Sequence, residues 1–591
     1  MNTLACCIAA LAVCSNGAAS AEWPHGKPHL GNASGTTLSR TIGPRSYHNT
    51  SDQYRRLGYL PGWPIVVRED MAAAGHHRQS RRRPLVSFVH FTDMHITDPQ
   101  SPSRNPFARK FGIDFRTNFR NQEALTLHVA DAMVQKVNAV QIGPVTGWPF
   151  SFVVSTGDNG DERQINELRS YIGLLDGGLI VADTSGQGYV GVQDDFVVPG
   201  QEAVYDQYWH PDPPPPGVGD DYFKREFGFP EYPGLLEAAT RNFQATGLDF
   251  PWYSGSGNHD GALVGYFRAL EEQNDLYWNP LGTGSQMFLE LPPGMDIGAF
   301  EVCLILPSLD CVSQVFTPAR LSRSVPSSPN RAQYLPADFL QMHFDSPATP
   351  GPVGHGFTQE NIKNNTLYYS FDMAPEVAGI MLDTVNRSGK DGGSIGSIQA
   401  QWLEEQLQAH SNRYFDEHGQ IVTTNNADKL LVLFSHHNLL TINNATSLEG
   451  DPDPTKLLAD DIKKIVLRYP NVILWINGHS HVNRIWAHRN FKSNTELQTE
   501  FWEVNTASHI DFPQLSRSME IVDNRDGTLS IFGILLDHIA KPRPHRRKLS
   551  LLNLASISRE LAANDPEWFL DFQLGAPADR NVELLIKKPF E

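Results

Sequence analysis

The sequence contains no hydrophobic run that approaches the ~18 to 20 apolar residues needed to cross a lipid bilayer. We therefore expect no transmembrane segment. The 591-residue chain is also short of positive charge, because 48 lysine and arginine residues stand against 66 aspartate and glutamate residues and leave a net charge of -18. A protein without a global positive field is a poor scaffold for nucleic acid, so no such role is expected.

Cysteine is scarce as well, with five residues in the whole chain. Three of them lie in the N-terminal stretch, where an apolar run from Leu4 to Cys14 is followed by Ala-Ser-Ala at positions 19–21. Such a small-residue pattern after an apolar run is typical of a signal-peptidase site. Residues 1–21 are therefore predicted to be a signal peptide, and the mature protein is predicted to be secreted or periplasmic.

Removal of this peptide would leave only Cys303 and Cys311, which are eight residues apart. In an oxidising compartment two such residues can close a small disulfide loop. Without knowledge of the compartment, two buried reduced thiols are an equally good interpretation. Export would favour the disulfide.

Residues 22–84 are rich in Gly, Ser, Thr, Arg and His and show little periodicity. This composition predicts an N-terminal extension that wraps on a domain or is partly disordered. The extension ends in the basic cluster Arg81-Arg82-Arg83. We interpret the cluster as a solvated basic stretch in preference to a patch for an anionic substrate.

Five apolar runs predict buried strands, at residues 85–91, 150–155, 377–382, 429–435 and 471–477. Helical patterns separate several of them, as at 397–407 and 460–469. Apolar strands that alternate with helices predict an α/β fold whose central strands are covered on both faces. Strand-like segments after residue 500 predict a second sheet that closes the domain.

The predicted domain spans residues 85–540 and is interrupted twice. Residues 185–250 and 280–375 break the alternation and are expected to be large insertions that form a cap over the site. Residues 541–591 are expected to be a C-terminal tail with one helix near 551–563, to which we assign no chemistry.

Polar side chains able to bind metal follow the apolar runs. Open α/β sheets place their sites at the carboxyl ends of strands, so these side chains are expected to converge on one crevice. His, Asp and Asn ligands suit Zn, Mn, Fe or Co, and there are too many of them for one tetrahedral ion. The sequence therefore predicts two divalent or trivalent metal ions that share a bridging carboxylate.

Five ordered blocks resemble the signature motifs of the calcineurin-like metallophosphoesterase superfamily. They are DMH (93–95), GDNGD (157–161), GNHD (257–260), SHH (435–437) and GHSH (478–481). A single D-x-H would be weak, but GNHD and GHSH in this order, each behind a strand, are specific. The resemblance implies a two-sheet sandwich flanked by helices, with large insertions in this chain.

The resemblance also implies a role for each motif residue. Asp93, His95 and His481 would hold the first metal ion. Asn258, His436 and His479 would hold the second, and Asp158 would bridge the two. His259 matches the catalytic histidine of the family, and Asp161 matches the carboxylate that orients it in the protein-phosphatase branch.

These assignments predict a metal-dependent hydrolase that acts on a small-molecule phosphate ester, because paired cations activate water for attack on phosphorus. Phosphodiesters are slightly favoured over monoesters, since the GDN, GNHD and HH blocks most resemble the diesterase type. The alternatives are a phosphomonoesterase and a non-catalytic metal-binding scaffold. The segment 392–396 also matches G-x-S-x-G of serine hydrolases, but a long polar stretch separates Ser394 from the preceding strand, which the nucleophile elbow does not allow.

Overall fold

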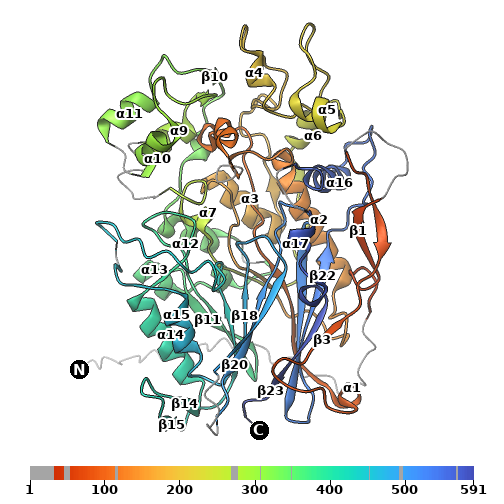
Figure 1. Ribbon diagram of the computed structural model, residues 1–591, viewed down its shortest axis with the longest axis vertical. Helices are drawn as coiled ribbons and strands as arrows, with labels where there is room; N and C mark the ends of the chain where they lie inside the picture. The colour runs from red at the N-terminus through yellow and green to blue at the C-terminus, as the bar shows by residue number, and fades with distance from the viewer. Residues whose placement is uncertain are drawn as a thin grey trace, which may run out of the picture.

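The structure is a computed structural model of mixed α/β type (Figure 1). It describes residues 32–45, 54–112, 117–267, 277–305, 308–347, 349–451, 453–490, 497–566 and 570–590. The predicted signal peptide lies outside the described residues. Within these ranges no helix combines the length and the apolar character needed to span a membrane.

One large sheet has six strands and is built mainly from the apolar runs of the C-terminal half. Its strand order is β11 (Tyr369–Ala374), β12 (Val377–Met381), β16 (Leu430–Phe434), β18 (Val472–Asn477), β20 (Glu500–Asn505) and β19 (Arg484–Arg489). The four inner strands are parallel, and the two outer strands run antiparallel to their neighbours. The carboxyl ends of β12, β16 and β18 therefore meet at one edge of the sheet.

The second large sheet has seven strands and gathers both ends of the chain. Its strand order is β3 (Val66–Arg68), β23 (Val582–Lys587), β22 (Thr528–Asp537), β21 (Leu515–Asp523), β4 (Arg83–Phe91), β5 (Val153–Ser155) and β8 (Trp252–Ser254). Strand β3 pairs with β23, and β23 pairs with β22. The expected division into an extension, a domain and a tail is therefore wrong in this respect, because residues 22–84 and 541–591 supply strands of the same sheet.

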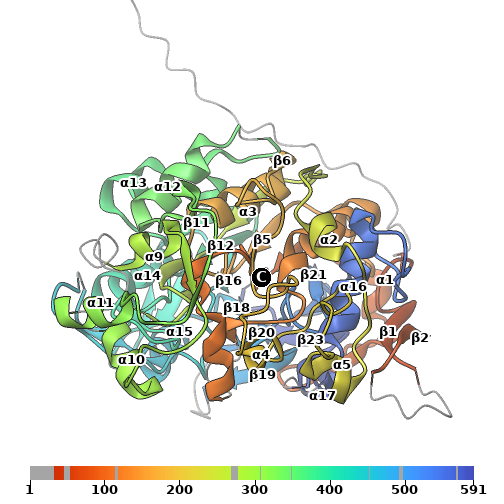
Figure 2. The ribbon, with the colours of Figure 1, turned by 90° about the horizontal axis from the view of Figure 1, so that it is seen from above.

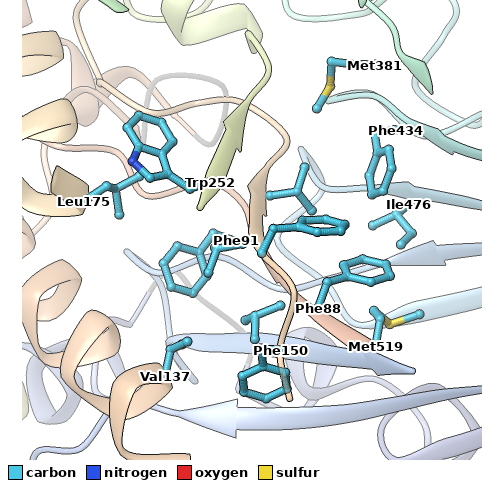
Figure 3. Packing of buried hydrophobic residues seen from close by; sticks show 14 of the residues in the cluster. Phe88, Phe91, Val137, Phe150, Leu175, Trp252, Met381, Phe434, Ile476 and Met519 are labelled. Carbon is cyan, nitrogen blue, oxygen red and sulfur yellow. The ribbon is translucent and has the colours of Figure 1, made fainter. Parts of the chain in front are cut away.

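A shared hydrophobic core joins the two sheets (Figure 3). Phe88 of β4 meets Phe434 of β16 with their ring centroids 6.0 Å apart, and both side chains are fully buried. Phe152 stacks on Phe88 with their ring centroids 5.0 Å apart. The near-continuous apolar runs are thus explained, since each central strand is covered on both faces.

Helices cover the outer faces of both sheets (Figure 2). On one side, α14 (Ser397–Ala409) and α15 (Ala459–Val466) pack through Leu403, Leu407 and Ile462 in a cluster with the six-stranded sheet. On the other side, α2 (Thr126–Val140) contacts β22 and also packs on α16 (Leu551–Ala562). The helix expected near 551–563 is therefore present and covers the core.

The two expected insertions occupy different places in the fold. The described helices α4 (Glu202–Tyr205), α5 (Tyr222–Phe227), α6 (Leu235–Ala239), α9 (Asn279–Thr283), α10 (Ile297–Ile305) and α11 (Leu309–Val315) lie above the strands in Figure 1. Helices α12 (Pro336–Asp345) and α13 (Gln359–Asn364) lie beside the sheets, and β11 is an edge strand. The expected insertion 280–375 is thus a cap only in its first part, because its last residues complete the six-stranded sheet.

The remaining α-helices and strands are short, apart from α3 with 12 residues. They comprise α1 (Arg78–Arg81), α3 (Ile165–Asp176), α7 (Asn258–Gly261), α17 (Leu570–Leu574) and the paired strands β1 (Arg40–Pro44) with β2 (Leu57–Pro61), β6 (Leu179–Ile180) with β7 (Phe243–Gln244), β9 (Gln286–Phe288) with β10 (Ser322–Ser324), β13 (Ile395–Gly396) with β17 (Lys456–Leu457) and β14 (Arg413–Phe415) with β15 (Ile421–Thr423). A disulfide joins Cys303 in α10 to Cys311 in α11, with their Cα atoms 5.5 Å apart, so of the two interpretations that the sequence left open the structure has the bridge.

Each arginine of the basic cluster at the end of the extension forms an ion pair, although Arg81 stays exposed to solvent. Arg82 and Arg83 pair with Glu583 and Glu376 respectively, and both arginine side chains are partly buried. Arg81 pairs with Asp526 at 3.2 Å. These ion pairs attach the start of β4 to other parts of the two sheets, which explains the charge cluster without an anionic ligand.

Candidate metal centre

The structure brings all seven predicted ligands into one buried cluster. Each comes from a loop that follows a strand: β4, β5, β8, β16 or β18. Because these strands are parallel to their neighbours, their carboxyl ends open toward the same crevice. Two groups of side chains, Asp93–His95–His481 and Asp93–Asp158–His436, have ligand atoms within 4.8 Å of one another.

In the first group, two imidazoles and one carboxylate face a common point. The Nε2 atoms of His95 and His481 are 3.2 Å apart, and His481 Nε2 is 3.2 Å from Asp93 Oδ1. A hydrogen bond between the two ring nitrogens needs a proton on one of them, while the other accepts it. Two imidazole nitrogens and one carboxylate oxygen at such spacing are also the ligand types of a transition-metal site.

A second donor group, distinct from the carboxylate-bearing sets above, consists of Asn258, His436 and His479, and the amide oxygen of Asn258 lies between the two imidazoles. Asn258 Oδ1 is 2.9 Å from His436 Nε2 and 3.0 Å from His479 Nδ1. All three side chains are buried or nearly so. This group matches the ligand set expected for the second ion.

Asp158 stands between the two groups. Its Oδ2 atom is 3.1 Å from His436 Nε2 and 3.6 Å from His95 Nε2. Its other oxygen, Oδ1, accepts a hydrogen bond of 2.8 Å from the backbone N–H of His259. The backbone thus fixes one oxygen and directs the other to both groups, which is the position a bridging ligand requires.

The backbone at the ligands is unusual. Asp93, His95, Asp158, His479 and His481 have φ values of 51°, 46°, 51°, 68° and 56°. Left-handed backbone at residues other than glycine costs about 1 to 2 kcal/mol each, and it concentrates at functional sites. Five of the seven predicted ligands share this strain, so the fold imposes the conformation on them.

The glycines of the motifs are required by close approach. A Cβ atom at Gly478 would lie 2.3 Å from Asp93 Oδ2, and a Cβ atom at Gly257 would lie 2.2 Å from Asp158 Oδ1. Any side chain at these positions would displace a ligand carboxylate. The glycines of GHSH and GNHD therefore let ligand loops pack closely against each other.

Two carboxylates, Asp161 within the GDNGD block and Asp511 outside the motifs, orient ligand imidazoles. Asp511 Oδ2 accepts a hydrogen bond of 2.6 Å from His481 Nδ1, and Asp161 Oδ1 accepts one of 2.6 Å from His95 Nδ1. Carboxylates in this position fix the tautomer and leave Nε2 for a metal ion. Sequence reasoning missed Asp511, because it lies in no motif and no spacing rule connects it to His481.

The contact between Asp161 and His259 differs from the expected one, in which the Asp161 carboxylate orients the histidine. His259 Nδ1 donates a hydrogen bond of 2.7 Å to the backbone carbonyl of Asp161, whereas the Asp161 carboxylate oxygen is 3.4 Å away. That carboxylate instead binds His95 and Arg104. His259 is therefore oriented by the main chain of Asp161, because two other partners occupy the side chain.

A buried charge network stands behind the metal groups. Arg104 pairs with Asp161 and also lies 2.8 Å from Glu123 and 3.5 Å from Glu162. Burial opposes ionisation of Asp161, but Arg104 holds the pKa of Asp161 well below its ordinary value. For Glu162 burial prevails over Arg104 and raises the pKa to about 8.

The metal groups themselves have shifted pKa values. Burial opposes the charge on His481, but Asp93 and Asp511 outweigh it and raise the pKa of His481 to about 9. Burial likewise opposes ionisation of Asp158, but the neighbouring histidines, His436 first, hold its pKa well below the ordinary value. The carboxylates are thus ionised and ready to bind a cation at neutral pH.

His437, the second histidine of the SHH block, is held by other groups. Its Nδ1 atom is 2.9 Å from Thr384 Oγ1, and its Nε2 atom donates a bond of 2.8 Å to the carbonyl of Asp391. Burial lowers the pKa of His437 to about 3, so the ring is neutral. We assign it a supporting position beside His479, whose ring centroid lies 4.4 Å away.

Comparisons with known proteins give only distant similarity. No protein-family profile and no curated protein matches the sequence. Among solved structures, the chain is similar to a dimetal phosphatase from Danio rerio, with 11% identity, 77% of this chain and 100% of that chain covered, and a TM-score of 0.32.

Two further solved structures are similar at 11% identity. They are the purple acid phosphatase PPD1 from yellow lupin, Lupinus luteus (82% of this chain, 54% of that chain, TM-score 0.25), and PhoD (81%, 68%, TM-score 0.28). The chain thus spans about half the length of the lupin protein. Because these TM-scores are low, the function proposed below is drawn from the residues of the site.

Proposed function

We propose that this protein is a metal-dependent hydrolase of phosphoric esters with a binuclear metal centre. One observation carries the proposal: side chains from five strand-end loops form two donor groups, and Asp158 Oδ2 lies within 3.6 Å of a histidine nitrogen of each. A structural site that closes around one ion needs four ligands and no shared carboxylate. A shared carboxylate between two groups is instead suited to a pair of ions.

The donor chemistry fits such ions. Asp93, His95 and His481 would hold one, Asn258, His436 and His479 the other, with Asp158 bridging. Mixed imidazole and oxygen ligands suit Zn, Mn, Fe or Co, whereas Mg and Ca prefer sites made of oxygen ligands. Bound together, two such cations supply an activated water molecule at neutral pH and neutralise charge on the phosphoryl oxygens.

His259 is the residue proposed to handle a proton. Its Nδ1–H is committed to the carbonyl of Asp161, so the transferable proton must be carried by Nε2. Its backbone N–H holds Asp158, which places the imidazole next to the bridging carboxylate. From this position the His259 ring is proposed to donate the Nε2 proton to the departing alkoxide, the usual task of a histidine general acid.

The substrate is proposed to be a small-molecule phosphate ester, with phosphodiesters favoured on the motif resemblance. The cap helices above α7 would supply the walls of the substrate pocket (Figure 1). The sequence pattern of residues 1–21 and the Cys303–Cys311 bridge support export. A two-sheet sandwich with helices outside is the proposed architecture, which agrees with the core between the sheets.

The test couples metal analysis of the purified protein to a panel of phosphomonoesters and phosphodiesters. We expect about two metal ions per chain, loss of hydrolysis on chelation, and recovery with Mn, Zn, Co or Fe. A serine-directed inhibitor should have no effect. Full activity in a metal-free sample would overturn the proposal, and two bound ions without hydrolysis of any ester would favour the non-catalytic scaffold.

A further inference from the structure

A tight turn directly follows the GNHD segment and packs against its side chains. It runs from Leu263 to Tyr266, and the N–H of Tyr266 donates a hydrogen bond of 3.0 Å to the carbonyl of Leu263. An antiparallel bridge between Leu263 and Phe267 closes its base. None of the five motif blocks includes these residues.

The turn has two consecutive residues with left-handed backbone. Val264 has a φ of 50° and Gly265 a φ of 69°, the combination of type I′ turns. Asn or Gly is usual at both positions, and a β-branched residue at positive φ is a genuine outlier. Strain of this kind persists only where the surroundings impose it, and it concentrates at functional sites.

The surroundings in this case are the cap. Leu263 and Val264 are buried in a hydrophobic cluster with Trp278, just before the second insertion, and with Phe300 and other residues of its first part. On the opposite side, the carbonyl of Tyr266 accepts a bond of 2.7 Å from the N–H of Lys390. The turn is therefore fixed between the cap and the loop that follows β12.

The turn fixes the orientation of the Asn258 amide. The carbonyl of Gly265 accepts a hydrogen bond of 3.0 Å from Asn258 Nδ2. Only the oxygen end of an amide can bind a metal ion, and the two ends have nearly the same shape. A carbonyl acceptor at the Nδ2 end selects the rotamer that turns Oδ1 toward His436 and His479.

Gly265 also lies against the edge of His259. A Cβ atom at position 265 would lie 2.3 Å from His259 Cδ2, 2.5 Å from His259 Nε2 and 2.5 Å from Asn258 Nδ2. Such an atom would push both side chains from their places. The absence of a side chain at this position is therefore required by the close approach as well as by the backbone.

From these contacts we infer that Gly265 is a positioning residue: its carbonyl selects the metal-binding rotamer of Asn258, and its bare Cα leaves His259 its place beside the metal groups. This inference rests on the proposed function for the roles of Asn258 and His259. It adds a link between the cap and the second metal group, because the same turn is part of the cap cluster.

The test is the Gly265→Ala variant, titrated stepwise with Mn²⁺ or Zn²⁺ in a calorimeter after removal of metal. We expect the affinity for one ion to fall about 10- to 100-fold, the usual loss when an outer partner of a ligand is removed. The affinity for the ion held by Asp93, His95 and His481 should stay unchanged. Equal loss at both ions, or no loss, would overturn the inference.

Gly217→Ala is the matched control. Gly217 has a φ of 87°, but no atom lies within 4 Å of the position a Cβ would take. The Gly217→Ala substitution therefore introduces a similar backbone strain in the cap without contact to the site. Both metal affinities should stay at the wild-type value in this variant, so a change in Gly265→Ala cannot be assigned to strain alone.

Asn258→Asp tests the same link without changing the turn, and it decides the matter should Gly265→Ala fail to fold. The added negative charge by itself would tighten cation binding. The new carboxylate oxygen, however, would face the Gly265 carbonyl, which accepts and cannot donate. We expect weaker binding of one ion by about 10-fold or more; tighter binding would show that the Gly265 carbonyl does not orient position 258.

These measurements separate the inference from the proposed function, because they need no substrate. A wild-type protein that binds two ions but hydrolyses no ester would overturn the proposed function and leave the role of Gly265 testable. A wild-type protein that binds fewer than two ions would overturn both.

Discussion

Binding of the first metal ion is predicted to release a proton from His481. His481 Nε2 is 3.2 Å from Asp93 Oδ1, and His481 Nδ1 is 2.6 Å from Asp511 Oδ2. Burial disfavours the charged ring, but the two carboxylates outweigh it and raise the pKa of His481 to about 9. An imidazole must be neutral at the ligating nitrogen, so the metal ion has to displace this proton.

The size of the effect follows from the shift. At pH 7 the pKa of His481 lies about two units above the pH, and at 1.36 kcal/mol per unit the proton weakens metal binding by about 2.7 kcal/mol, or roughly 100-fold. The affinity should therefore rise about tenfold per pH unit between pH 7 and 9 and level off above that range. Asp511→Asn keeps a hydrogen-bond acceptor but removes a charge, which lowers the pKa of His481. The metal affinity of this variant should therefore level off at a lower pH.

Calorimetric titration of the metal-free protein in buffers of different ionisation enthalpy counts the protons released. The pKa of His436 is also raised, although burial opposes its charge, because Asp158 lies beside it. The difference between the wild type and Asp511→Asn therefore isolates His481. Asp526→Asn, which removes a carboxylate paired with Arg81 at 3.2 Å, is the control for net charge. Identical proton counts in wild type and Asp511→Asn across pH 7 to 9 would refute the reasoning.

The raised pKa of His481 weakens metal binding, but it stabilises the metal-free fold. A histidine whose pKa is raised in the folded state binds its proton more tightly there than in the unfolded chain. The resulting stabilisation is fully present below about pH 6.5 and is lost as the pH rises through about 9. Denaturant unfolding of the metal-free protein should show this decline between pH 7 and 9, and Asp511→Asn should show less of it.

Three further changes probe the bridge, the proton donor and the charge network. Asp158→Asn should reduce the metal content below two ions per chain, because its Oδ2 lies within 3.6 Å of histidines of both groups; two retained ions at wild-type rate would show that it does not bridge. His259→Ala should keep both ions but lose about 10² to 10⁴ in rate on alkyl esters, with a smaller loss on nitrophenyl esters that need no proton; equal losses would exclude the acid role. Arg104→Met should cost about 3 to 5 kcal/mol in urea unfolding, because it leaves the buried carboxylates of Asp161 and Glu123 without the Arg104 charge; a loss below about 1 kcal/mol would contradict this.

The strands and the ligand set could be predicted because their signals are local. The apolar run at 471–477 became β18, Val472–Asn477, and the GHSH block follows it directly. An apolar run fixes where a strand ends, and the end of a parallel strand fixes where the next polar residues point. Strand-end motifs therefore predicted that these side chains lie close together without knowledge of the strand pairing, and their role as metal ligands stays a prediction.

Long-range pairing was beyond the same reasoning. Strand β3 has three residues, Val66–Arg68, and joins the sheet only because β23, more than 500 positions later, lies beside it: Val66 pairs with Val582. A short strand of this kind has no periodicity to detect. Asp511 was missed for a similar reason, since its contact with His481 depends on how the loop after β20 folds back over the first metal group.

The left-handed backbone of the ligands explains why motifs alone do not define the geometry. Asp and His have no intrinsic preference strong enough to hold φ near 50° in five places. The loops instead hold one another: the N–H of Asp93 bonds to the carbonyl of Gly157 at 3.0 Å, and that of His95 to the carbonyl of Asp158 at 2.9 Å. These backbone bonds join the first ligand loop directly to the bridging loop. The main chain thus contributes to the arrangement of the donor groups, in addition to the motif side chains.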